Sequence, residues 1–130
     1  FLISIPVGIL IALVLFINEF PDYLADKTVG KRTLVVILGK RRAVILYHIL
    51  LACVYLTVAF LLIFKFLPLM SLIVFLSLPL AIKAYVISKN NFDKIYELLP
   101  ANAYTIGLHS IIGLLLCAGF ILDKIFLWRL

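Results

Sequence analysis

Four apolar runs dominate this sequence, and their length constrains the fold more than any other feature. A run of about 22 residues, as a helix rising about 1.5 Å per residue, extends about 33 Å and spans a bilayer. Lipid offers the backbone no hydrogen-bond partner, so we expect each run to be a helix. None of them alternates apolar and polar residues as a membrane β-strand does. The runs are Phe1 to Ile17, Ala43 to Phe64, Phe66 to about Ile87, and Tyr104 to Leu122.

The composition excludes an ordinary soluble domain. Of the 130 residues, 66% are hydrophobic, and the mean hydropathy is +1.28. A soluble domain is about half apolar and, at this size, has too little interior to hide more. We therefore expect an all-α, polytopic transmembrane bundle of about four membrane helices, with residues 1–130 in a single domain.

The basic residues predict a topology and not a nucleic-acid partner. The net charge is +6, but no nucleic-acid motif or basic face on a polar scaffold is present, so the expected partner is the lipid bilayer. Under the positive-inside rule, nine of the twelve basic residues place the first and third connections in the cytoplasm, in the plasma (inner) membrane. The nine are Lys27, Lys31, Arg32, Lys40, Arg41, Arg42, Lys83, Lys89 and Lys94, against Lys65, Lys124 and Arg129 on the opposite side.

An acidic stripe follows the first run. Asn18, Asp22 and Asp26 recur every fourth residue, so on a helix their side chains share one face. Carboxylate and amide oxygens suit a hard cation such as Mg²⁺, which completes its shell with waters and phosphate oxygens. Pro21 lies within the stripe and is expected to kink or restart the helix.

A basic turn comes next, in the sequence Gly30-Lys31-Arg32-Thr33. Lys31 offers a point charge and Arg32 a planar fork suited to phosphate. Acidic residues followed by a basic turn are suited to binding a diphosphate that is bridged to a metal ion. From spacing alone, however, a solvated loop explains these charges at least as well, and the segment is neither an EF-hand nor a P-loop.

Resemblance to a known family favours the diphosphate interpretation. The segment NEFPDYLADKTVGKRTL, starting at Asn18, resembles the second aspartate-rich motif of the UbiA prenyltransferase superfamily. The following VVILGKRRA is similar to members close to the 1,4-dihydroxy-2-naphthoate polyprenyltransferases of menaquinone synthesis. The later segment LPANA, from Leu99 to Ala103, and the helix carrying His109 are similar less specifically.

The resemblance implies a function and a set of site residues. It implies Mg²⁺-dependent transfer of a polyprenyl group from polyprenyl diphosphate to an aromatic acceptor. Asp22 and Asp26 are the implied catalytic residues, holding Mg²⁺ with Asn18, while Lys31 and Arg32 bind diphosphate. The four helices would be the C-terminal part of a nine-helix fold. The family's first aspartate-rich motif is absent from residues 1–130, so we expect a fragment that lacks the N-terminal part and is inactive alone.

Several alternatives remain open from the sequence. Elsewhere in the family the acceptor is 4-hydroxybenzoate, haem or a glycerophosphate lipid, and each is an alternative here. A transporter fragment with its site at the kinked helix, or a non-catalytic membrane scaffold, is the alternative outside it. His48 and His109 lie on stripes of small and polar residues, which predicts buried packing with a satisfied hydrogen bond for each.

Overall fold

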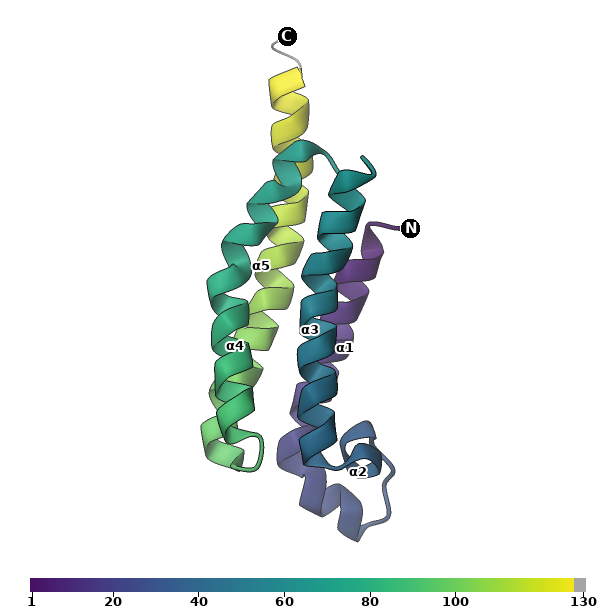
Figure 1. Ribbon diagram of the computed structural model, residues 1–130, viewed down its shortest axis with the longest axis vertical. Coiled ribbons are helices and arrows are strands. Elements are labelled where there is room, and N and C mark those ends of the chain that lie inside the picture. The colour runs from purple at the N-terminus through teal and green to yellow at the C-terminus, as the bar shows by residue number, and fades with distance from the viewer. Residues whose placement is uncertain (128–130) are drawn as a thin grey trace.

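The computed structural model describes residues 1–127, which form helices lying lengthwise side by side (Figure 1). Four helical segments are long and apolar enough to cross a membrane. This confirms the predicted all-α, polytopic fold. The elements are α1 (Ser4–Thr28), α2 (Leu34–Leu38), α3 (Lys40–Ile63), the 3₁₀ helix η1 (Leu69–Ser77), α4 (Leu78–Asn91) and α5 (Ile95–Leu127).

Most of the buried apolar residues come from α1, α3 and α5. Helix α1 packs against both α3 and α5, and α5 packs along η1 and α4. Only Lys65 and Pro68 interrupt the second and third apolar runs, which predicts a tight hairpin between them. The chain does turn sharply at Lys65, which takes a φ of 59°. Beyond that turn α3 packs chiefly on α1 while η1 and α4 pack on α5, so the two sequential spans are not each other's main partners.

The third span is the one whose local structure differs from a plain α-helix. It starts as η1 and becomes α4 only from Leu78. Pro79, at the start of α4, has no backbone N–H, so the carbonyl of Phe75 four residues earlier loses its α-helical donor. Gly119 of α5 also brings the η1 backbone close, because a Cβ there would lie 2.6 Å from Ser71 Oγ and 2.8 Å from Ser71 Cα.

Polar side chains link α3 to other spans in three pairs. Each pair buries hydroxyl or imidazole groups that lipid could not satisfy. For His48 the predicted hydrogen bond is confirmed, although the ring is only half-buried. His109 is also half-buried and makes no side-chain hydrogen bond within residues 1–127. The pairs are Tyr47 with Thr105 at 2.6 Å, His48 with Ser88 at 2.9 Å, and Tyr55 with Ser77 at 2.8 Å.

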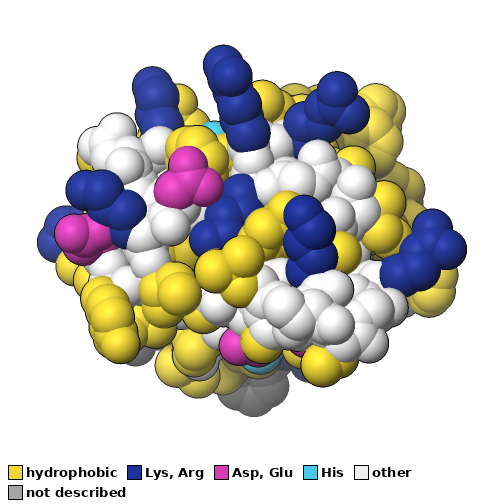
Figure 2. Space-filling view, turned by 90° about the horizontal axis from the view of Figure 1, so that it is seen from below, with side chains coloured by type: hydrophobic (Ala, Val, Ile, Leu, Met, Phe, Trp, Pro, Cys, Tyr) yellow, Lys and Arg dark blue, Asp and Glu magenta, His cyan; other side chains and the backbone are white. Residues whose placement is uncertain are grey.

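Both long connections lie at one end of the bundle. α1 and η1–α4 run down to this end in Figure 1, and α2 and the α4–α5 connection lie there. Seen from below, Lys and Arg side chains stand over much of this face (Figure 2). The shared side that the charge distribution predicted is therefore present. Arg129, counted on the opposite side, lies outside the described residues.

Candidate functional site

The acidic stripe lies on the last turns of α1. This helix continues through Pro21 to Thr28, so the predicted restart does not occur. The last turns of α1 nevertheless bend away from the axis of the rest of the helix (Figure 1). Because the helix is continuous, Asn18, Asp22 and Asp26 share one face. Asp26 is 7% exposed, whereas the other two are exposed to solvent.

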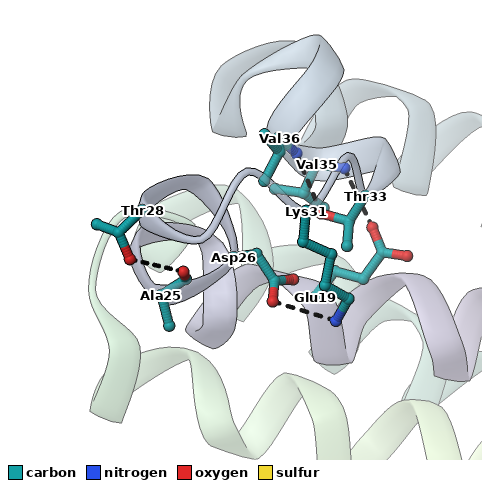
Figure 3. A network of polar contacts seen from close by, with 8 residues as sticks. All are labelled: Glu19, Ala25, Asp26, Thr28, Lys31, Thr33, Val35 and Val36. Atoms are coloured by element: carbon teal, nitrogen blue, oxygen red, sulfur yellow. Dashed lines mark hydrogen bonds and ion pairs between the residues drawn. The ribbon is translucent and has the colours of Figure 1, made fainter.

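The basic turn folds back onto this stripe. Gly30 takes a φ of 72°, which a residue with a Cβ rarely adopts, and this lets the chain reverse after α1. The Lys31 backbone N–H then donates to the Asp26 carbonyl at 2.9 Å. Its ammonium Nζ lies 3.1 Å from Asp26 Oδ1 (Figure 3). The structure thus brings together one acid and one base that the sequence singled out.

The Asp26 carboxylate has one oxygen to spare. Its Oδ1 pairs with Lys31, whereas Oδ2 is buried and has no hydrogen-bond partner among the described residues. A buried carboxylate oxygen without a donor or cation is costly. The Lys31 side chain is 61% exposed, so solvent weakens its hold on the carboxylate. This end of the stripe is therefore suited to an additional positive charge.

Glu19 was not predicted as part of the site. Its Oε2 accepts a hydrogen bond from the Val35 backbone N–H at 3.1 Å (Figure 3). Thr33 caps the same short helix, α2, through Val36 N at 3.4 Å. Of the two contacts, the one from Glu19 holds the start of α2, and with it the far end of the basic turn, against α1. The available signal was an ionisable residue at the end of a membrane run, where charge is expensive and usually has a partner.

Three further basic residues line an open groove at the same end of the bundle as the stripe. Arg32 is exposed next to Lys31. The groove has a volume of about 1010 Å³ and is lined by Lys40, Arg41 and Arg42 at the start of α3, by Tyr23, and by Phe92 and Asp93 across from them. Lys27 and Lys40 each place an ammonium group over the Tyr23 ring, at 5.7 Å and 5.5 Å from its centre. This groove is therefore predominantly basic and lies at the same end of the bundle as the stripe.

The oxygen groups of the stripe fit Mg²⁺ only if a ligand completes the shell. Within residues 1–127, no three His, Cys, Asp or Glu side chains gather to hold a metal. The stripe offers the carboxylates of Asp22 and Asp26, one with an unpaired buried oxygen, and the amide of Asn18. Mg²⁺ usually takes one or two protein carboxylates and shares the rest of its shell with phosphate oxygens and waters. The residues present fit that pattern.

Comparison with known proteins gives one match. The sequence profile of the UbiA prenyltransferase family matches residues 1–112, which include the stripe, the basic turn and the first half of α5. Neither a search of curated proteins nor one of solved structures gives a match.

Proposed function

This chain belongs to the UbiA prenyltransferase family, and we propose that it carries one half of an Mg²⁺-dependent diphosphate site that moves a polyprenyl group onto an aromatic acceptor. The observation that supports this most is Asp26, buried at the base of the stripe with Lys31 at 3.1 Å and a second oxygen unpaired. Neither a transporter nor a scaffold calls for this arrangement, and the family's activity is prenyl transfer.

Each residue of the proposed site has a part in binding the diphosphate. Asp22 and Asp26 hold the cation, with Asn18 supporting them, and Lys31 and Arg32 bind phosphate oxygens. The Lys31 ammonium group is mostly exposed and can turn from Asp26 to a phosphate. Bound Mg²⁺ supplies positive charge that stabilises the departing diphosphate. The apolar spans enclose the prenyl chain and keep water from the allylic cation that the acceptor ring attacks.

We place the acceptor among aromatic quinone precursors, because the segment after the motif resembles the naphthoate-prenylating members linked to menaquinone. The alternatives are 4-hydroxybenzoate, haem or a glycerophosphate lipid. The test supplies the full-length enzyme with one polyprenyl diphosphate and each acceptor in turn, in nanodiscs with Mg²⁺. We expect prenylated dihydroxynaphthoate as the main product. A preference for another acceptor contradicts the quinone assignment, and no transfer to any acceptor contradicts the proposed function.

Residues 1–130 alone are expected to show no turnover. The proposed site needs a second aspartate-rich segment to hold the other side of the diphosphate, and residues 1–130 contain only one such segment. Purified residues 1–130 and the full-length enzyme should be compared in the same prenyl-transfer assay. Robust Mg²⁺-dependent transfer by residues 1–130 would show that a single motif suffices.

We also propose that the end of the bundle carrying the site faces the cytoplasm across the plasma (inner) membrane. The test uses a variant without Cys53 and Cys117, the free cysteines, into which Thr28→Cys, Asn91→Cys or Phe66→Cys is introduced. In right-side-out vesicles, an impermeant thiol reagent should label only Phe66→Cys, which lies exposed in the α3–η1 turn. Outside labelling of Thr28→Cys and Asn91→Cys would reverse the topology.

A further inference from the structure

A buried amide on α5 contacts the acidic stripe. Asn102 is 7% exposed, and its Nδ2 donates to Asn18 Oδ1 at 2.8 Å. Asn18 is the first residue of the stripe and lies 84 positions earlier in the sequence. Asn102 Oδ1 is buried as well and has no hydrogen-bond partner in the described part of the chain.

Helix packing alone does not account for this amide. The neighbours of Asn102 on α5 already bury α5 against the rest of the bundle, since Ala101 and Thr105 are 0% exposed. Thr105, one turn further along, provides a hydrogen bond to α3 through Tyr47 at 2.6 Å. An apolar side chain at position 102 would bury without leaving an unpaired oxygen. The amide therefore stabilises the fold less than an apolar side chain would, unless its remaining oxygen acquires a partner.

We propose that Asn102 is a positioning residue of the diphosphate site. Its Nδ2 fixes the amide plane of Asn18, and with it the first oxygen of the stripe. Its Oδ1 is left to accept a hydrogen bond from water that arrives with the Mg²⁺–diphosphate complex, which brings ordered water to otherwise unpaired buried groups. This inference rests on the proposed function, because Asn102 gains its second partner only if the stripe binds that complex.

The position of Asn102 on a second helix, α5, explains how it orients the Asn18 side chain. Asn18 is exposed on α1, and an exposed amide side chain on a single helix is free to change rotamer. Asn102 lies on a second helix that packs along α1. Its hydrogen bond holds the Asn18 side chain in one orientation. A site whose side chains are already held in their binding orientation binds more tightly, because those side chains lose less rotational freedom on binding. Asn102 should therefore affect ligand binding more than it affects folding.

The experiment measures binding of inorganic diphosphate in the presence of Mg²⁺, by titration calorimetry on the full-length protein in nanodiscs, together with thermal unfolding. Asn102→Leu should weaken binding by about tenfold, the effect of one hydrogen bond to a charged or ordered group. It should not lower the Tm. The matched control is Tyr47→Phe, which removes the other buried hydrogen bond to this part of α5 and should lower the Tm while leaving binding within about twofold.

Further variants keep the proposal testable if Asn102→Leu fails to fold. Asn102→Ala, Asn18→Ala and the double variant form a cycle in which the double variant should bind no more weakly than the worse single variant, since the two amides act as one unit. Wild-type affinity in Asn102→Leu or Asn102→Ala, or equal weakening by Tyr47→Phe, overturns the role of Asn102. Binding that ignores Mg²⁺, or an absence of binding by the wild type, overturns the proposed function itself.

Discussion

Asp26→Asn is expected to lower kcat/KM for prenyl transfer at least about a hundredfold, and Asp22→Asn to do the same. Asparagine keeps the volume of aspartate but removes the negative charge that, in the proposed site, holds Mg²⁺ against the diphosphate. Losing a metal interaction that acts in the transition state costs several kcal/mol, and about 1.4 kcal/mol is tenfold in rate. The measurement is prenyl transfer by the full-length enzyme in nanodiscs, with Mg²⁺ titrated for each variant.

Two further variants separate a site from a charged surface. Lys31→Gln should weaken diphosphate binding less severely than either aspartate change, since Arg32 remains next to it. Asp93→Asn is the matched control, because Asp93 is an exposed carboxylate at the same end of the bundle but outside the stripe. It should retain the wild-type rate, as exposed charges contribute little. Full activity and unchanged Mg²⁺ dependence in both Asp22→Asn and Asp26→Asn would refute the site.

Gly119→Ala is expected to destabilise the bundle by about 1–3 kcal/mol, the usual cost of overpacking a close contact. The added Cβ would lie 2.8 Å from Ser71 Cα, a separation that Cβ atoms essentially never show. It would also lie 3.0 Å from Ser71 N, which is tighter than most real Cβ contacts. Backbone atoms cannot rotate away as a side chain can, so η1 and α5 must move apart. Thermal unfolding in detergent, followed by far-UV circular dichroism, measures the change in Tm.

Gly113→Ala provides the control on the same helix. A Cβ at Gly113 meets no heavy atom within 4 Å, so the change only replaces a poor helix former by the best one. It should leave the Tm unchanged or raise it slightly. Equal Tm values for the two variants would mean that the close contact between Gly119 and Ser71 does not limit packing.

The fold was predictable in the segments where lipid leaves the backbone no alternative to a helix. Long apolar runs must form helices, and the positions of the basic residues indicate which connections share a side. Two features were not predictable from the runs. The 3₁₀ start of the third span depends on Pro79 and on the space that Gly119 opens on another helix. The main partners of α3 depend on which faces are complementary, and a short turn at Lys65 does not decide that.

Only the parts of the site that lie close together in the sequence were predictable. The spacing of Asn18, Asp22 and Asp26 follows from helix geometry, and the basic turn lies close in sequence. Glu19 and Asn102 were missed as members of the site because their roles depend on contacts with distant residues. The hydrogen bond of Glu19 crosses 16 residues and that of Asn102 crosses 84. Without a structure, Glu19 looks like an isolated polar residue next to a membrane segment. Asn102 stands out only as a member of the LPANA segment.

The contact between α1 and α5 also determines when this bundle can be completed. Membrane helices enter the bilayer in the order of synthesis and associate there afterwards. When α1 and α3 are in place, α1 has only one of its two main neighbours, and Asn18 still lacks Asn102. The second neighbour arrives with α5, the last span described. A ribosome that stalls after α4 therefore leaves an inserted but unfinished bundle, whose acidic stripe has formed on α1 without its anchor.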